Sequence, residues 1–304
     1  MEKKTILGID LGGTNIRVGK VSEYKVVDLY SRRISSNGSE QQVIDEVISS
    51  IKERFDDCVA GIGVGVPSLV DVEKGIIYDV QNIPSWKEVH LKTILEREFK
   101  VPVYINNDAN CFVVGEKYFG NGKDYDNIVG LIVGTGLGAG IYFDNRLYLG
   151  ANCGAGEFGM LPYKGGCYED YCSGQFFSKR LNVSGEEIFD KAKTGDKEAL
   201  RIFQEFGTHL GNVISAIVLA VDPEIIILGG SVSEAYKYFK EAVIISLQNF
   251  PYKNSIKNLK ITTSSLSQVA ILGAAALYFE NRGIIAGSPE IEIIKNTSNE
   301  CYNS

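Results

Sequence analysis

The chain has 304 residues, 44% hydrophobic and 23% charged, a composition typical of a globular protein long enough for two domains. The formal net charge is -7 at pH 7 and no dense cluster of Lys and Arg offsets it, so a nucleic-acid-binding surface is not expected. The N-terminus lacks a basic stretch followed by an apolar segment, and no apolar run is long enough to span a bilayer. We expect a cytoplasmic protein with small-molecule partners and no membrane partner.

The cysteine and histidine content limits the chemistry that the chain can perform. Six cysteines are scattered along a sequence without a secretory signal, which indicates free thiols and not a disulfide framework. The only histidines are His90 and His209. This scarcity argues against a His-based catalytic triad or a His-rich metal site.

The first third of the chain predicts strands covered by helices. "TILGIDLGGTNIRVGKV" is apolar on both sides of a Gly-Gly-Thr turn and "KVVDLYSRRI" follows, so we expect a three-stranded meander. Apolar residues at helical spacing after Ser39, a good N-cap, predict an amphipathic helix. "VAGIGVGVP" predicts a strand buried on both faces. A loop with "NIPSW", a helix over 91–99, the strand "VPVYIN" and a helix over 108–119 complete this part.

A similar order of elements begins again at "NIVGLIVGTGLGAGIYFDNRLYLG". Aligning residues 8–12 with residues 130–134 gives two strand-turn-strand units, which suggests duplicated α/β lobes. Residues 151–174 are rich in Gly, Cys and Tyr without periodicity, and we expect a substrate-facing loop without structure of its own. Helices up to Ala220, the strand "EIIIL" and helices around 234–248 and 269–280 follow.

The first glycine turn, "DLGGTN", is a candidate phosphate site. The N–H groups of Gly12 and Gly13 lack an obstructing Cβ, and the Thr14 hydroxyl is a further donor to phosphate oxygens, with Asn15 beside it. Asp10, at the strand end, can hold magnesium directly or through its waters. A plain type I′ or II′ hairpin turn is the alternative interpretation.

Two further glycine turns follow similar logic. "GTGLGAG" matches G-x-G-x-x-A, but that fingerprint requires a helix next, whereas a strand follows, so we reject a nicotinamide site. We interpret Gly134, Thr135 and Gly136 as a second phosphate turn, with Thr135 and Gly136 donating to a γ-phosphate. Gly229 and Gly230, in "VDPEIIILGGSVSE", would let adenine or ribose pack against backbone; a simple loop with Ser231 or Ser233 as a helix cap remains the alternative.

Taken together and in this order, the segments resemble the ROK family of sugar kinases and sugar-responsive repressors, up to about residue 282. The resemblance lies in "GIDLGGTNIRVG", "GVGVPSLVD", "NIPSW", "NNDANCFVVGE", "GTGLGAGIYFDNRLYLG", "GAGEFGMLP", "GCYEDYCSG" and "VDPEIIILGG". It implies an α/β fold of two ribonuclease-H-like (actin-like ATPase) lobes around a central cleft, with a sugar in the cleft and ATP with magnesium across the glycine turns. We expect a small lobe at 1–107, completed by the C-terminal helix and tail at about 283–304, and a large lobe at 108–282.

The same resemblance implies roles for individual carboxylates and amides. Asp108 matches the general base that deprotonates the sugar hydroxyl, a role that a carboxylate within hydrogen-bond reach can perform. Asp108 is also placed to cap the helix that follows. Asn107, Glu157 and Glu169 match ligands of sugar hydroxyls, unless the two glutamates are simply solvated loop residues. Ser68 stands where the family usually has a sugar-contacting glycine.

The sequence departs from the family at its zinc loop. Met160 replaces a histidine that contacts sugar and zinc, and of the family's zinc cysteines only Cys167 is matched. Cys153 and Cys172 do not compensate for the missing imidazole, so we expect no zinc. Because one sugar contact is lost with that imidazole, an N-acetylated hexosamine competes with glucose as the expected substrate.

Three functions remain to be weighed. A repressor would need a winged-helix segment before the first glycine turn, and we expect none because that turn begins near Gly8. A relic without activity would have lost some of the expected site residues. We therefore expect an ATP-dependent kinase acting on a hexose, at the 6-hydroxyl of an aldohexose such as glucose. The alternatives are an N-acetylmannosamine or N-acetylglucosamine kinase, or a non-catalytic sugar-binding ROK protein; the resemblance also suggests a homodimer.

Overall fold

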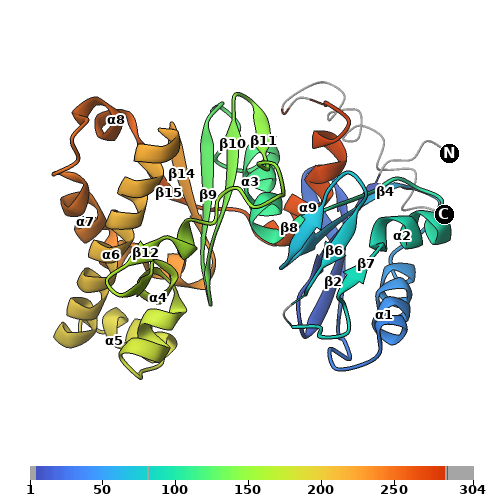
Figure 1. Ribbon diagram of the computed structural model, residues 1–304, viewed down its shortest axis with the longest axis horizontal. Coiled ribbons are helices and arrows are strands. Elements are labelled where there is room, and N and C mark those ends of the chain that lie inside the picture. The colour runs from blue at the N-terminus through green and yellow to red at the C-terminus, as the bar shows by residue number, and fades with distance from the viewer. Residues whose placement is uncertain (1–4, 81, 285, 287–304) are drawn as a thin grey trace. The chain divides into compact units, whose positions relative to one another are not determined.

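The computed structural model describes residues 5–80, 82–284 and 286, which form two compact units (Figure 1). Of the described residues, unit 1 comprises 5–80, 82–124, 149–155, 265–284 and 286. Unit 2 comprises Tyr125–Tyr148 and Gly156–Ser264. The expected lobe division at residue 107 stays a prediction, and most of the expected tail lies outside the described residues.

Unit 1 is built on a five-stranded mixed sheet in the order β3-β2-β1-β4-β8. Its strands are β1 (Thr5–Leu11), β2 (Asn15–Ser22), β3 (Lys25–Arg33), β4 (Val59–Val66) and β8 (Val103–Asn107). The first three form the predicted antiparallel meander, while β1, β4 and β8 run parallel. The interior position of β4 explains its unbroken run of apolar residues and glycines.

Four helices pack on this sheet: α1 (Glu40–Lys52), α2 (Leu91–Phe99), α3 (Asp108–Phe119) and α9 (Val269–Glu280). They confirm the four predicted helices of this region. As predicted, Ser39 caps α1, its side chain accepting from the N–H of Gln42. Helix α9 approaches so closely that a Cβ on Gly63 of β4 would overlap the carbonyl of Ala274.

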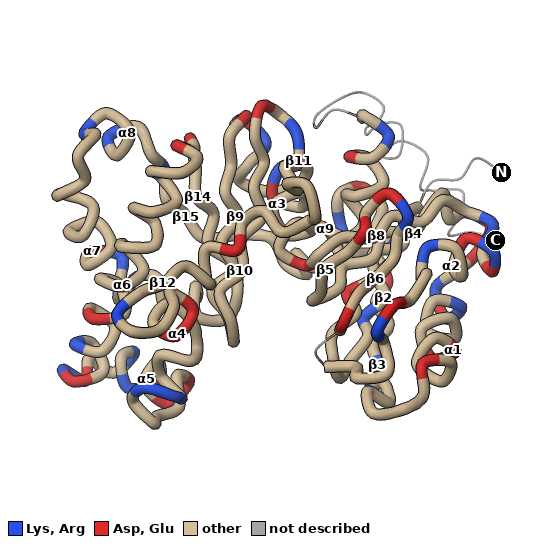
Figure 2. Tube along the Cα trace, in the orientation of Figure 1, with Lys and Arg blue, Asp and Glu red and all other residues tan. Residues whose placement is uncertain are grey.

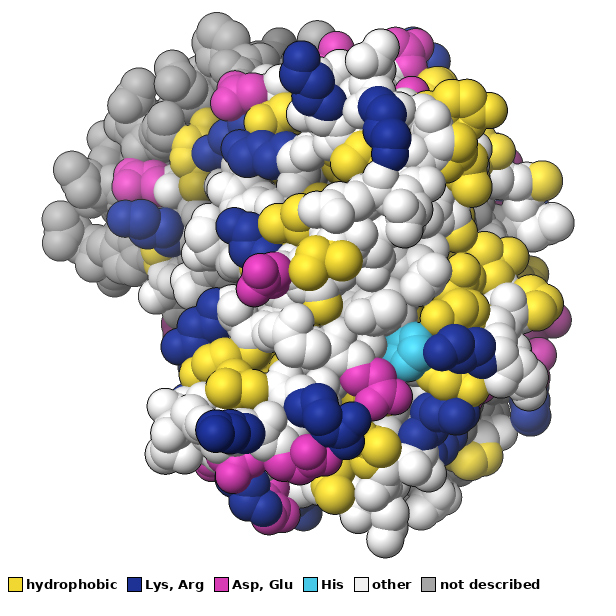
Figure 3. Space-filling view, turned by 90° about the vertical axis from the view of Figure 1, so that its left-hand side faces the viewer, with side chains coloured by type: hydrophobic (Ala, Val, Ile, Leu, Met, Phe, Trp, Pro, Cys, Tyr) yellow, Lys and Arg dark blue, Asp and Glu magenta, His cyan; other side chains and the backbone are white. Residues whose placement is uncertain are grey.

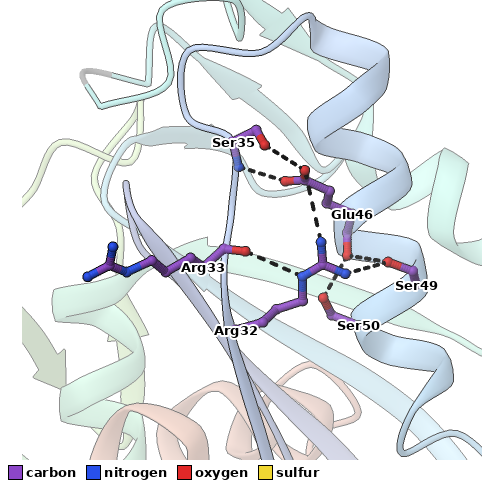
Figure 4. Close-up of polar contacts among 6 residues, drawn as sticks. All are labelled: Arg32, Arg33, Ser35, Glu46, Ser49 and Ser50. Atoms are coloured by element: carbon purple, nitrogen blue, oxygen red, sulfur yellow. Dashed lines mark hydrogen bonds and ion pairs between the residues drawn. The ribbon is translucent and has the colours of Figure 1, made fainter.

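A polar network joins the end of β3 to α1 (Figure 4). The Glu46 carboxylate accepts from the N–H and the hydroxyl of Ser35 at 2.7 and 2.8 Å, and the Arg32 guanidinium lies 3.9 Å away. Burial works to raise the pKa of Glu46, but Ser35 and Arg32 outweigh it and hold this pKa below its usual value. Glu46 is therefore ionised at neutral pH and fixes the chain after β3.

The sequence missed a small three-stranded sheet in unit 1. It consists of β5 (Leu69–Asp71), β6 (Ile76–Tyr78) and β7 (Glu88–Val89), in a region expected to be a loop. Strands of two or three residues are too short to show a two-residue periodicity, so this prediction was wrong.

Unit 2 repeats the topology of unit 1, with the strand order β11-β10-β9-β14-β15. Its strands are β9 (Ile128–Val133), β10 (Leu137–Phe143), β11 (Arg146–Tyr148), β14 (Ile225–Gly229) and β15 (Lys260–Thr263). Again three strands form an antiparallel meander and the next two add in parallel. This identity of order and direction confirms the duplicated α/β architecture that the sequence suggested.

Unit 2 carries helices α5 (Gly185–Lys193), α6 (Lys197–Val221), α7 (Tyr236–Leu247) and α8 (Lys253–Asn258). Aromatic rings join α6 to α7, with the centroids of Phe206 and Phe239 5.2 Å apart. On the face drawn in Figure 3, charged side chains of both signs are dispersed among apolar ones. Figure 2 shows basic and acidic positions scattered along the described chain. None of the helices in the described part is long and apolar enough to cross a bilayer.

Residues 151–174 do not form the structureless loop that was expected. They contain η1 (Phe158–Met160), β12 (Pro162–Tyr163), β13 (Gly166–Cys167) and α4 (Glu169–Cys172), and the π-helical η2 (Phe176–Arg180) follows. These elements are too short for their periodicity to be visible in the sequence.

The cysteines follow the expectation of free thiols in part. The structure has free thiols at Cys111, Cys153, Cys167 and Cys172. The expectation fails at Cys58, which is disulfide-bonded. Cys301 lies outside the described residues.

Candidate functional site

The carboxyl ends of the parallel strands in unit 1 bring two predicted site segments to one sheet edge. Asp10 of β1 is level with Gly65 of β4, which is level with Asn106 of β8. Two strand spacings separate the Cα atoms of Asp10 and Asn106, which corresponds to about 10 Å. Asp108 follows Asn106 by two residues. The sheet therefore places the predicted magnesium carboxylate and the predicted base near the same edge.

Asp10 is paired with a cation that the sequence analysis did not identify. Arg17, directly opposite Asp10 on β2, donates to Asp10 Oδ2 from Nε at 3.0 Å and from Nη2 at 2.6 Å. Arg17 Nη1 also donates to Gln268 Oε1 at 3.3 Å. The register of the hairpin was the available signal, because it places residues 10 and 17 side by side.

Magnesium fits this carboxylate only in part. Arg17 bonds to Oδ2 of Asp10, so Oδ1 is the oxygen left for a metal or its water, and the side chain is 25% exposed. Among the described residues, no three His, Cys, Asp or Glu side chains gather into a metal site. One carboxylate suits an ion that keeps most of its waters and is held mainly by phosphates.

The first glycine turn differs from the simple hairpin that was its alternative interpretation. Neither Gly12 nor Gly13 has a positive φ, whereas type I′ and II′ turns require one at a central residue. A Cβ on Gly13 would overlap the side chain of Asn82. Thr14 is exposed, and its carbonyl accepts from the N–H of Ile34 at 3.0 Å. The turn is thus fixed to β3 and leaves the Thr14 side chain accessible.

Helix α3 begins at Asp108, but its cap is the preceding residue. Asn107 Oδ1 accepts from the N–H of Ala109 at 2.9 Å, so the expectation that Asp108 caps this helix was wrong. Asp108 Oδ1 accepts from the same N–H at 2.8 Å, and its side chain is exposed in the first helical turn. An anion at a helix N-terminus is favoured by the helix dipole.

Ser68 and Asn107 are connected directly. Asn107 Nδ2 donates to the carbonyl of Ser68 at 3.3 Å, and the Ser68 hydroxyl donates to the carbonyl of Tyr78. The structure therefore brings together three of the predicted substrate residues, Ser68, Asn107 and Asp108, within unit 1.

In unit 2, the second glycine turn is enclosed by neighbouring backbone. The N–H of Gly134 donates to the carbonyl of Gly136 at 3.0 Å, and the N–H of Gly174 donates to the carbonyl of Gly134 at 2.7 Å. The third turn abuts it, since a Cβ on Gly230 would lie 2.5 Å from the carbonyl oxygen of Val133. Strand β10 follows the turn, which confirms the rejection of a dinucleotide fingerprint.

A cavity of about 490 Å³ opens beside this turn within unit 2. Its lining includes Gly134, Thr135, Gly174, Phe189, Ser231 and Val232. The predicted Gly229 and Gly230 are not on its lining, but Ser231 follows them directly. The alternative interpretation required Ser231 or Ser233 to cap a helix. Ser233 does not do so, because its hydroxyl donates to the Gly230 carbonyl at 2.7 Å.

Glu169 is not a solvated loop residue. Its Oε2 accepts from the N–H of Leu137 at 3.0 Å, and its Oε1 accepts from Gln175 Nε2 at 2.8 Å. The pKa of Glu157 is raised, first by burial and then by the charge of Glu169. The two predicted hydroxyl ligands of unit 2 therefore interact, and Glu169 also touches the chain next to Gly136.

An aromatic cluster occupies the loop for which the sequence analysis expected a shortened zinc motif. The Tyr163 hydroxyl bonds to Nδ1 of His209 at 2.9 Å, and the rings of Tyr168 and Tyr171 stack on or abut Tyr163. Burial raises the pKa of Tyr163 to about 12, so this hydroxyl keeps its proton at neutral pH. Met160 is 56% exposed. The expectation of no zinc stays a prediction.

The sequence model of the ROK family matches residues 6–281 of this chain. The chain belongs to the ROK family. Its two five-stranded mixed sheets form the two lobes of the fold seen in ROK structures of the actin-like ATPase type.

Relatives of this ROK protein include kinases and regulators. Glucokinase of Thermotoga maritima is 29% identical over 316 residues, covering 93% of this chain and 100% of the relative. The xylose repressor of Bacillus subtilis is 28% identical over 299 residues, covering 90% of this chain and 77% of the repressor. A ROK family glucokinase from Streptomyces griseus in complex with glucose and AMPPNP has a TM-score of 0.74 at 25% identity, covering 90% and 98% of the two chains.

Proposed function

We propose that this ROK protein is an ATP-dependent sugar kinase that transfers the γ-phosphate to a hexose hydroxyl, the 6-hydroxyl of an aldohexose such as glucose. The observation that carries the proposal is the carboxyl edge of the unit 1 sheet. Asp10 and the Asn107–Asp108 pair lie at that edge, about two strand spacings apart. The proposed metal carboxylate and the proposed base are therefore held at the same edge of one sheet.

Asp108 is the proposed general base. Its exposed carboxylate would accept the proton of the sugar hydroxyl as that oxygen attacks phosphorus. Asn107 and Ser68 are the proposed sugar ligands of unit 1, and Glu157 and Glu169 are the proposed ligands of sugar hydroxyls in unit 2. The pKa of Glu157 is raised because burial and the charge of Glu169 destabilise its ionised form. Hydroxyl donors of a sugar would stabilise that ionised form.

The glycine turns are the proposed phosphate sites. Asp10, Gly12, Gly13, Thr14 and Asn15 would face the phosphates in unit 1. In unit 2, Gly134, Thr135 and Gly136, with Gly229 and Gly230 behind them, would hold the rest of ATP. The 490 Å³ cavity beside Thr135 supports a nucleotide in unit 2, because its volume lies in the range of small-molecule sites.

Magnesium would be held by Asp10 through water and by the phosphates. When bound it neutralises charge on the transferring phosphoryl group. Arg17 fixes the Asp10 carboxylate with two bonds, so Arg17 is a positioning residue for that role.

An N-acetylhexosamine is the second candidate substrate. Met160, on η1 three residues after Glu157, presents an exposed thioether where relatives with the zinc motif have an imidazole. A thioether provides apolar contact to an acetyl methyl but no hydrogen bond to a hydroxyl. The non-catalytic alternative predicts sugar binding without ADP formation.

The first experiment is a coupled assay of ADP formation with ATP, magnesium and a panel of hexoses and N-acetylhexosamines. Asp108→Asn should lower kcat by about 10²–10⁴-fold with little change in sugar affinity, because only proton transfer is lost. Asp57→Asn, the same charge change at an exposed residue of unit 1, should leave kcat unchanged. No ADP with any sugar would refute the kinase proposal, and near-normal turnover of Asp108→Asn would refute the base.

Two expectations from the family need separate measurements. Zinc content by elemental analysis tests the absence of zinc. Sedimentation velocity tests the expected homodimer, for which unit 2 offers exposed apolar side chains at Leu219, Ile244 and Ile245.

A further inference from the structure

Unit 1 contains a cavity of about 610 Å³ next to the proposed sugar residues. One wall is the β5–β6 region, with Leu69, Asp71, Glu73 and Tyr78, and the other is the loop 149–153. At about 30 Å³ per water, the cavity has the volume of roughly twenty water molecules. This is more room than one hexose requires.

Both walls are anchored to residues that would bind the sugar. Leu69 follows Ser68, whose carbonyl accepts from Asn107 Nδ2 and whose hydroxyl bonds to the carbonyl of Tyr78. On the opposite wall, Cys153 Sγ lies 3.5 Å from Oδ1 of the buried Asn106, just before Asn107. The cavity therefore begins beside Asn107.

The cavity is nevertheless distinct from the proposed hydroxyl ligands. None of Ser68, Asn107 and Asp108 belongs to its lining. A hexose positioned by Asn107 and Asp108 would leave the volume between β5 and the loop 149–153 for a further group on the same substrate.

The lining indicates which chemical group fits. Asp71, Glu73 and Asn152 supply carboxylate and amide acceptors, and Leu69 and Val72 supply apolar surface. Sugars combine hydroxyl donors with apolar C–H faces, so they satisfy both kinds of surface.

Charge argues against an anionic occupant. The lining has two acidic side chains and no Lys or Arg among its described residues. Lys74, which pairs with Asp71 at 3.1 Å, does not belong to the lining. A sugar phosphate or nucleotide in this cavity would bring like charges together, whereas a neutral sugar would not.

We propose that this cavity is a subsite for a second sugar unit, glycosidically linked to the hexose that is phosphorylated. This inference rests on the proposed kinase function and assigns its substrate class as disaccharides or larger glycosides. The residues Leu69, Asp71, Glu73, Tyr78, Ala151 and Asn152 determine this specificity without taking part in phosphoryl transfer.

The test compares kcat/KM for cellobiose and maltose with that for glucose, on the full chain. Ala151 lies on the cavity wall and is exposed, so Ala151→Trp should block the subsite. We expect kcat/KM for the accepted disaccharide to fall at least about tenfold, and that for glucose to change less than about twofold. Asn37→Trp adds the same side chain to an exposed turn of unit 1 outside the cavity and should change neither value.

The outcomes separate the two proposals. Phosphorylation of monosaccharides with no higher kcat/KM for either disaccharide would overturn the subsite and leave the kinase standing. An equal loss for both substrates in Ala151→Trp, with a native circular dichroism spectrum, would also overturn it. If no sugar of either size yields ADP, the proposed function fails and the subsite fails with it.

Discussion

The buried histidine of unit 2 should make the stability of this protein depend on pH in a defined window. His209, on α6, is 3% exposed, and its Nδ1 is hydrogen-bonded to the Tyr163 hydroxyl. Burial, and then the charge of Lys164, lower the pKa of His209 from 6.5 to about 4, although Glu205 opposes this. The imidazole is therefore neutral in the folded protein at neutral pH.

The magnitude follows from the difference between the two states. As the pH falls below 6.5, the unfolded chain binds a proton at residue 209 while the folded chain does not until about pH 4. The unfolding free energy should therefore be highest above pH 6.5, decrease down to about pH 4, and then show no further contribution from this group. The full difference corresponds to about 3 kcal/mol.

Two measurements test this reasoning. The chain has only two histidines, so the Hε1 resonance of His209 can be assigned with a His209→Gln variant and titrated directly in the native protein. Urea unfolding from pH 4 to 7 should show a slope that His209→Gln reduces, whereas His90→Gln, at an exposed site, should retain it. A His209 resonance that titrates above pH 6, or equal slopes in all three proteins, would refute the neutral buried imidazole.

Two further substitutions test the third glycine turn, at Gly230, and the bonds between Glu46 and Ser35. Gly230→Ala should weaken binding of an ATP analogue and lower stability by more than Gly195→Ala, measured by calorimetry and urea unfolding. Both glycines have φ near +80°, a conformation that costs an introduced alanine about 1–3 kcal/mol. Only at position 230 would the new Cβ also lie 2.5 Å from the Val133 carbonyl oxygen. Equal losses in the two variants would contradict this reasoning. Glu46→Gln should cost about 1–2 kcal/mol at pH 7, because the charge-assisted bonds to Ser35 weaken. Since the pKa of Glu46 is lowered, this difference should disappear as the pH falls through that value, and a pH-independent difference would exclude the charge as its cause.

Sequence patterns predicted the helices and strands that are long enough for the periodic spacing of their apolar residues to be visible. Strand β4 and helix α3 each contain enough residues for an apolar run or a helical spacing to be visible, and α3 begins at the predicted Asp108. The strands β5, β7 and β12 have two or three residues and show no period. They are held by pairing with β6 and β13, which are equally short.

The candidate site divides in the same way. Its glycine turns are local, and residues such as Gly134–Gly136 were found by reading along the chain. Its supporting contacts join distant positions: Leu137 to Glu169 and Tyr163 to His209. No motif spacing links these pairs, so the sequence identified the residues that would meet a ligand but not those that hold them.

The repeated topology also shows how the two glycine turns differ in chemistry. The alignment of residues 8–12 with residues 130–134 makes Asp10 of β1 equivalent to Ile132 of β9, and β1 and β9 are the central strands of their sheets. Asp10 pairs across its hairpin with Arg17, whereas Ile132 pairs with Gly138. Of the two aligned strands, only β1 therefore carries a carboxylate at this position; the carboxylate beside the turn of unit 2 belongs to Glu169 of α4 and accepts from Leu137 N–H and Gln175 Nε2. If both turns hold phosphates, Asp10→Asn should raise the magnesium concentration that activity requires. Thr135→Val should weaken nucleotide binding and leave that magnesium requirement unchanged.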